Sequence, residues 1–177
     1  MNLNSDVNDT DTLVVGLVYR SPNSSDLQNT ALENMIREVT QCDYKHLLLF
    51  GDFNYPEIDW SVEVANVPAN HAAYSFLNCI QDSFLTQHVS RPTHYRHGQT
   101  ANTLDLIFTG DNRLIADVDY VEPVGMSHHL VLQWTVACRV FSPTVPCLRY
   151  RYDKADYKGM CHTPGFKHVR KCTLKKI

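Results

Sequence analysis

The chain has 177 residues, an apolar share of 44% and a formal net charge of −3 at pH 7. This length and composition are those of a single globular domain with a substantial core. A negative balance argues against tight nonspecific binding to nucleic acid. No apolar run approaches the length needed to cross a bilayer, so no membrane partner is expected.

Charge is distributed unevenly along the chain. Residues 1–147 hold 7 Lys and Arg against 17 Asp and Glu, a net of −10, whereas residues 148–177 hold 9 against 2, a net of +7. The basic end could contact phosphates, but we expect a solvated and poorly ordered end. We therefore divide the chain into a polar leader (1–12), a domain (13–140) and a basic tail (141–177).

The cysteine pattern and the N-terminus bear on the compartment. The 6 cysteines form no C-x-x-C pair, and Met1 is followed by neither a charged segment nor an apolar core of a signal peptide. Reduced thiols in the nucleus or cytoplasm are the expectation, and a secreted protein is not.

The first elements form a β-α-β unit. Residues 13–19 are apolar and β-rich, which predicts a buried strand. Ser25-x-x-Gln28 resembles a capping box. The residues after it place apolar side chains at positions 0, 3, 4 and 7, which predicts a helix. Residues 45–50 then predict a second strand, parallel or adjacent to the first.

The later elements are less regular. Residues 55–69 contain prolines and alternate acids with apolar residues, which predicts a surface loop. Residues 70–82 repeat the helical spacing. The remaining expected strands are 84–89, 103–108, 118–121 and 130–136. In the last of these, the even-numbered residues would line one face and the odd-numbered residues the other.

A polar pair follows the most apolar strand. Residues 47–50 are bulky and apolar and lead into Gly51, which permits backbone conformations that other residues resist. The period-2 spacing of Asp52 and Asn54 points both side chains the same way and turns Phe53 toward the core. Such a pair can hold an activated water and a phosphoryl oxygen. An ordinary polar turn is the alternative.

Two further polar residues stand near strand ends. Asp105 lies between two leucines, so on a strand it points to solvent or into a polar site. Adjacent histidines, His128 and His129, precede the last predicted strand. The order of these residues along the chain suggests one site, because open sheets gather ligands at strand ends.

Four motifs resemble the endonuclease/exonuclease/phosphatase superfamily, most closely the endonuclease domains of jockey-like non-LTR retrotransposons. They are Y-R-S-P-N (19–23), L-L-F-G-D-F-N (48–54), T-L-D-L-I-F (103–108) and S-H-H-L-V-L (127–132). The resemblance implies an α/β fold, a four-layer α/β sandwich of DNase I-like type. It also implies cleavage of DNA phosphodiesters with Mg²⁺ or Mn²⁺, and a reverse transcriptase domain downstream, to which residues 149–157 resemble a connector.

The resemblance also implies roles for residues at matching positions. Tyr19, Asn23 and, approximately, Thr93 match residues that contact phosphate or the DNA backbone. Asp52 matches the acid that activates or orients the attacking water. Asn54 matches the amide that positions that acid and the phosphate.

The remaining roles, and one departure, concern the histidines. His129 matches the catalytic histidine, and Asp105 matches the acid that orients it. The family motif S-D-H has a metal-holding acid where this chain has His128, and imidazole is a poor magnesium ligand.

A second departure is the start of the chain. It begins just before Y-R-S-P-N, so the N-terminal half of the family domain, with its metal-binding glutamate, is expected to be missing. We therefore expect a partial sandwich with an exposed apolar face. Activity is expected to be weak or absent. The alternatives are a non-enzymatic nucleic-acid- or protein-binding remnant, or a divergent phosphodiesterase or phosphatase.

Overall fold

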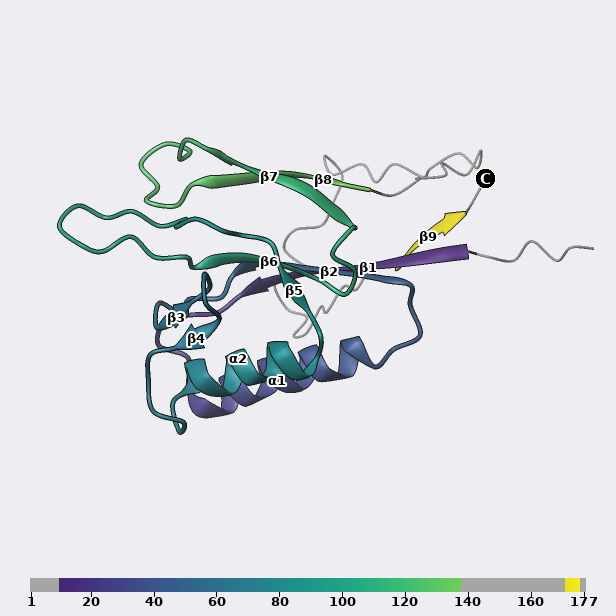
Figure 1. Ribbon diagram of the computed structural model, residues 1–177, viewed down its shortest axis with the longest axis horizontal. Helices are drawn as coiled ribbons and strands as arrows, with labels where there is room; N and C mark the ends of the chain where they lie inside the picture. The colour runs from purple at the N-terminus through teal and green to yellow at the C-terminus, as the bar shows by residue number, and fades with distance from the viewer. Residues whose placement is uncertain (1–9, 138–170, 176–177) are drawn as a thin grey trace, which may run out of the picture.

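The computed structural model describes residues 10–137 and 171–175 (Figure 1). In chain order the elements are β1 (Thr10–Tyr19), α1 (Asp26–Thr40), β2 (His46–Asp52), β3 (Ile58–Asp59), β4 (Val64–Ala65), α2 (Ala72–Asp82), β5 (Thr86–Gln87), β6 (Asp105–Thr109), β7 (Ile115–Val121), β8 (Val131–Val136) and β9 (Lys171–Lys175). Neither helix in this part of the chain is long and apolar enough to cross a membrane.

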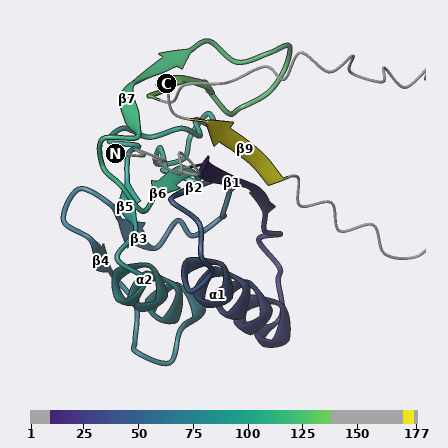
Figure 2. The same ribbon diagram turned by 90° about the vertical axis from the view of Figure 1, so that its right-hand side faces the viewer.

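These elements stack in three layers. The middle layer is a five-stranded sheet in the order β5-β6-β2-β1-β9. β1 and β2 are parallel, which confirms the predicted β-α-β unit, and the other pairs are antiparallel. α1 and α2 lie side by side on one face, and the β7–β8 pair lies over the other (Figures 1 and 2). The fold is thus mixed α/β, with three of the four layers expected of the sandwich.

Both helices begin and face the sheet for reasons visible in the sequence. The Ser25 side chain accepts from the Gln28 amide, and the Gln28 side chain accepts from the Ser25 amide, so the capping box is confirmed. α2 begins differently, since the His71 ring accepts from the Ala73 amide. The predicted apolar faces point to the sheet, although Met35 at the rim of its face is exposed.

An aromatic cluster forms the core between helices and sheet. Phe76 of α2 is fully buried, and its ring stacks on Tyr55 with centroids 4.4 Å apart. The prediction of a plain surface loop at 55–69 was wrong, because Tyr55 and Ile58 are only 1% and 5% exposed and β3 pairs with β4. Some of its apolar residues face inward, whereas Val62 and Val64 are exposed. Each fully buried aromatic contributes roughly 2–3 kcal/mol of hydrophobic stabilisation.

A smaller core lies under β7 and β8. Trp134 packs edge-on against Phe50 of β2, with ring centroids 5.1 Å apart. Leu132, Trp134 and Val136 pack against this core, as the predicted alternation requires. β7 is longer than predicted and β5 shorter, and Phe84 is left exposed with a positive φ of 52°.

The basic tail departs from its expectation where it is described. Lys171–Lys175 form β9, which pairs antiparallel with residues 10–14 of β1, so this stretch belongs to the sheet. β1 therefore begins inside the predicted leader. The rest of the predicted tail, including the connector-like residues 149–157, lies outside the described residues.

Candidate functional site

The first part of the site is the turn that ends β2. Gly51 has a φ of +139°, and a Cβ there would lie 1.9 Å from the Val18 carbonyl oxygen, so only glycine fits beside β1. Phe53 is buried, which leaves Asp52 and Asn54 on the other side. The Asn54 backbone amide donates to Oδ1 of Asp52 at 3.2 Å, and its side-chain Nδ2 donates to Oδ2 at 3.0 Å. The two residues thus form one hydrogen-bonded unit.

The second part is an acid–histidine pair. Asp105 begins β6 and lies directly opposite Asp52 in the β2–β6 register. Nδ1 of His129 lies 2.8 Å from Oδ2 of Asp105, and both side chains are partly exposed. With Nδ1 donating to the carboxylate, Nε2 is left to face a ligand.

Backbone pairing brings His129 to β6. The segment around His94 forms bridges with both Asn102 and His129. The Leu130 amide donates to the Thr93 carbonyl at 2.7 Å, and the Tyr95 amide donates to the His128 carbonyl at 2.9 Å. The chain at 93–95 therefore joins the segment that carries His129 to the strand that carries Asp105.

The predicted contact of Thr93 with the DNA backbone needs a correction. Its side chain is fully buried, and its hydroxyl accepts from the amides of Leu104 and Asp105 at 3.1 and 3.0 Å. A buried hydroxyl engaged in this way cannot reach a DNA backbone. Thr93 instead fixes the start of β6.

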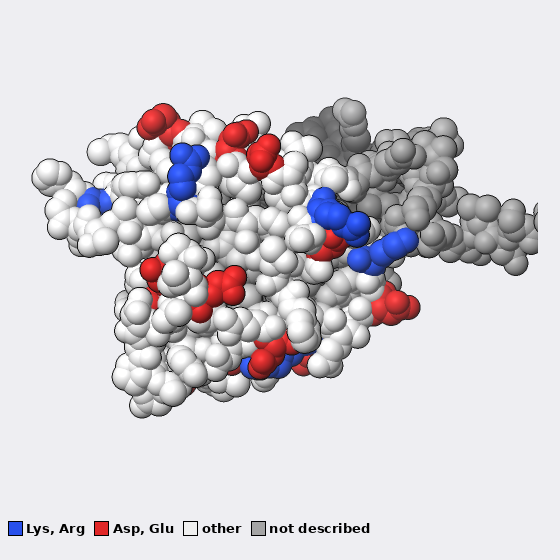
Figure 3. All heavy atoms as spheres, viewed as in Figure 1, with Lys and Arg blue, Asp and Glu red and all other residues white. Residues whose placement is uncertain are grey.

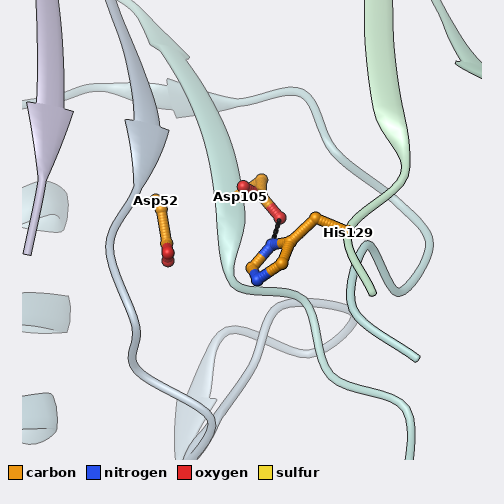
Figure 4. A group of neighbouring side chains, drawn as sticks. All are labelled: Asp52, Asp105 and His129. Carbon is orange, nitrogen blue, oxygen red and sulfur yellow. Dashed lines mark hydrogen bonds and ion pairs between the residues drawn. The ribbon is translucent and has the colours of Figure 1, made fainter. Parts of the chain in front are cut away.

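The three groups converge. One ligand atom from each of Asp52, Asp105 and His129 lies within 4.8 Å of the others (Figure 4). Among the described residues this is the one set of three or more acids, histidines or cysteines close enough to hold a metal ion, and His128 is not part of it. Tyr19 lies beside Asp52 in the β1–β2 register.

Asn23 stands apart from the three converging groups. It is exposed in the loop after β1, where its amide donates to the Ser21 hydroxyl at 3.3 Å. Its described hydrogen bonding is thus local to the loop, and the prediction that it contacts phosphate stays a prediction.

The environment of Asp52 changes its acidity. Burial raises the pKa of Asp52 above its ordinary 3.8, and the nearby Asp105 raises it further. His129, the Asn54 amide and Arg20 act in the opposite direction. The Asp52 carboxylate thus holds a proton more readily than a solvated aspartate.

A second imidazole flanks the pair. The His94 ring centroid lies 4.7 Å from that of His129 and 6.2 Å from that of His128. Burial lowers the pKa of His94, and the two neighbouring histidines lower it further. We therefore expect His94 to be neutral at pH 7.

One residue at this site was not singled out in the sequence. The guanidinium of Arg20 donates to the Asn54 carbonyl at 2.7 Å and to Oδ1 of Asn29 at 2.8 Å. A signal was present, because Arg20 is the first cation of an acidic segment and stands inside the Y-R-S-P-N motif.

The donor set suits a hard divalent cation. Such a cation is commonly held by one or two carboxylates, with waters and substrate phosphate completing the shell. Asp52 and Asp105 offer two carboxylates on neighbouring strands, and a cation between them would relieve the repulsion that raises the pKa of Asp52. The residues present therefore fit one such ion.

Comparison with protein families identifies the chain. Residues 13–133, more than half of the sequence, match the family described as Endonuclease-reverse transcriptase. The chain belongs to this family. The match covers all four motifs of the sequence analysis, and it confirms the resemblance to the endonuclease/exonuclease/phosphatase superfamily.

Two solved structures are similar to part of this chain. One is the endonuclease domain of TRAS1, a telomere-specific non-LTR retrotransposon, with 16% identity, a TM-score of 0.49, and coverage of 68% of this chain and 54% of that one. Another is a variant of the 3′ phosphatase NExo from Neisseria bound to a product DNA hairpin, with 15% identity, a TM-score of 0.47, and coverage of 68% and 59%. This chain thus spans less than two thirds of either. No curated protein sequence matches it.

Proposed function

We propose that this member of the endonuclease-reverse transcriptase family cleaves phosphodiester bonds of DNA by metal-dependent hydrolysis, with low activity. The convergence of Asp52, Asp105 and His129 within 4.8 Å is the observation that supports it. Phosphodiester hydrolysis needs a base for the attacking water and donors for charge that develops on the phosphate. These three side chains can supply both.

Asp52 is the proposed general base. Burial raises the pKa of its carboxylate, and a cation bound beside it would offset part of that rise. The two hydrogen bonds from Asn54 fix the orientation of that carboxylate. In this proposal Asp52 accepts the proton of the water that attacks phosphorus, and Asn54 keeps it aimed.

His129 is the proposed electrophilic partner. The carboxylate of Asp105 holds Nδ1, so Nε2 donates toward the phosphate and stabilises the charge that builds there. Figure 4 shows the imidazole joined to Asp105, with the Asp52 side chain to one side of this pair. Asp105 therefore positions the imidazole.

A magnesium or manganese ion would be held by Asp52 and Asp105. When bound, it would act as a Lewis acid that polarises the phosphoryl group and offsets negative charge. His128 occupies the position of a family acid and is not among the converging groups. Two carboxylates are a small donor set, which is why we propose low activity.

The proposed DNA contacts lie on the loop beside His129. Arg91, Arg96 and His97 stand on this loop, and Tyr19 and Asn23 lie at the end of β1. Residues 10–137 carry only 6 Lys and Arg against 15 Asp and Glu. On the face drawn in Figure 3, charges of both signs are scattered, with no broad basic patch among the described residues. We therefore propose few phosphate contacts and weak, salt-sensitive binding.

The family name suggests a further partner. A reverse transcriptase domain in the same polypeptide would use a nick as the start of DNA synthesis, and we propose that this chain acts beside one. Such a role would place the protein where it meets DNA, in the nucleus or the cytoplasm.

Supercoiled plasmid nicking tests the proposed activity. The chain is incubated with Mg²⁺ or Mn²⁺, beside Asp52→Ala and the matched control Asp59→Ala, whose exposed carboxylate accepts hydrogen bonds from Ser61 and is not among the converging groups. We expect nicking that chelation stops, that Asp52→Ala lowers by at least about 100-fold and that Asp59→Ala leaves unchanged. Equal nicking by wild type and Asp52→Ala, or none by either, would refute the proposal.

A further inference from the structure

Arg20 contacts the Asp52–Asn54 turn and the residue after it through both its backbone and its side chain. Its backbone amide donates to the Asp52 carbonyl at 2.8 Å, which continues the β1–β2 pairing one residue beyond β1. Its Nη1 donates to the Asn54 carbonyl at 2.7 Å, across 34 positions of sequence. The guanidinium carbon lies 3.9 Å from the ring centroid of Tyr55, so this cation also packs on an aromatic face.

Asn54 in turn donates a hydrogen bond to Arg20. Its Nδ2 donates to the Arg20 carbonyl at 3.1 Å and to Oδ2 of Asp52 at 3.0 Å. Arg20 and Asn54 therefore hold each other through one bond in each direction. The same amide group that completes this exchange also orients the Asp52 carboxylate.

The backbone at this turn needs such support. Asn54 has a φ of +52°, in the left-handed region that non-glycine residues seldom occupy. A residue in this conformation persists when surrounding contacts hold it there. The bond from Arg20 to the Asn54 carbonyl fixes the peptide group that follows the positive φ.

The Arg20 side chain is also bonded to α1. Nε of Arg20 donates to Oδ1 of Asn29 at 2.8 Å, and Asn29 is one of the few buried polar residues in the described part of the chain. An unpaired buried amide would be costly, so this bond ties the guanidinium to the helix layer. The position of the turn is thus fixed relative to α1, which is a rigid element.

The charge of Arg20 matters less than its shape. Among the groups that alter the acidity of Asp52, Arg20 has the smallest effect, behind burial, Asp105, His129 and the Asn54 amide. A fork that donates in two directions and stacks on a ring is a property of arginine that lysine lacks. The geometry accounts for the choice of this residue.

We propose that Arg20 is a positioning residue, which locks the Asp52–Asn54 turn in its left-handed conformation and so aims the Asp52 carboxylate into the site. The inference rests on the proposed function for its catalytic consequence. The lock itself is a property of the fold and can be tested without activity.

Nicking kinetics give the first test. Arg20→Ala and Arg20→Lys are compared with Arg37→Ala, which removes an exposed cation that pairs with Glu33 on α1. We expect kcat to fall about 100-fold in both Arg20 variants, with KM within about 3-fold of wild type, because a misplaced catalytic group affects the chemical step. Failure of lysine to restore kcat would separate the fork from the charge. Wild-type kcat in Arg20→Ala would overturn the proposal.

Amide hydrogen exchange gives a test that needs no activity. In wild type the Asn54 amide, bonded to Asp52, should be protected, and in Arg20→Ala it should exchange at least about 10-fold faster. The amides of Leu48 and Leu49 inside β2 should stay unchanged, which excludes general unfolding. Unchanged Asn54 exchange would overturn the lock. If wild type does not nick, the proposed function fails and exchange alone decides the inference.

Discussion

The central sheet has one face that is sealed and one that is partly open. Under α1 and α2 a continuous cluster of buried residues includes four packed aromatic rings, and the partly buried ring of Trp60 packs against them. On the other face β7 and β8 cover β2 and β6, but Val15, Leu17 and Tyr19 of β1 remain 38%, 76% and 75% exposed. A pocket of about 210 Å³, which Phe50 and Trp134 help to line, also lies on this side.

The two faces of the sheet hold different residues of the site in place. Asp52 and Asp105 stand on β2 and β6, which the sealed face anchors through Phe53 and Phe108. His129 arrives just before β8, from the thinner layer. The acids should therefore depend on the helix-side core, whereas the histidine should respond separately to changes in the open side.

The largest expected effect comes from the sealed face. Phe76→Ala removes a fully buried ring that contacts Phe53, Tyr55 and Phe108. We expect the free energy of unfolding to fall by about 3–5 kcal/mol, since the cavity cannot collapse inside a packed aromatic cluster. Urea denaturation measures the change. A loss below about 1 kcal/mol would mean that the sealed face is not the main support.

The open face should tolerate a similar deletion better. Trp134→Ala removes a partly buried ring next to an existing cavity, so we expect a loss of about 1–2 kcal/mol. NMR of the variant should show altered His129 signals and unchanged amide shifts at Phe53. Equal changes in the His129 signals and in the Phe53 amide shift would contradict the proposal that the two faces hold different site residues in place.

A histidine at the sheet edge gives a pH test. Burial lowers the pKa of His88, and its Nε2 lies 2.7 Å from the Thr109 hydroxyl. The unfolded chain therefore binds a proton at this site near pH 6.5, where the folded chain does not, so stability falls as pH drops below that value. His88→Gln should lose less stability than wild type between about pH 7.5 and about pH 5 in urea titrations. Parallel pH profiles would contradict the burial effect.

The smallest effect on stability is expected at the exposed part of β1. Leu17→Lys changes a side chain that is 76% exposed, so the free energy of unfolding should shift by less than about 0.5 kcal/mol. Its effect should appear in solubility, because a charge interrupts an exposed apolar face. Light scattering at rising concentration should show less aggregation than in wild type. A large loss of stability would mean that Leu17 is covered in solution.

Local patterns predicted much of this molecule. The capping box at Ser25, the helical spacing and the apolar runs of β1 and β2 act over a few residues, so the β-α-β unit could be read directly. Ordered motifs likewise drew attention to Asp52, Asp105 and His129 before their proximity was known. These signals can be read from the sequence because each of them lies within a few consecutive residues.

Other contacts between distant segments could not be predicted. The burial of Tyr55 depends on α2, and the engagement of the Thr93 hydroxyl depends on the start of β6. The role of Arg20 at Asn54 spans 34 positions, and β9 joins the sheet from the far end of the chain. In each case the partner is set by the fold, and no local spacing encodes it.

The most direct test of the central claim asks whether Asp105 and His129 act as one unit. Plasmid nicking is measured for Asp105→Ala, His129→Ala and the double variant. Because Asp105 positions the imidazole as well as holding the metal ion, its removal should cost less in the His129→Ala background than in wild type, so the double variant should nick faster than the product of the two single losses predicts. Losses that multiply, or a His129→Ala variant as active as wild type, would contradict the account.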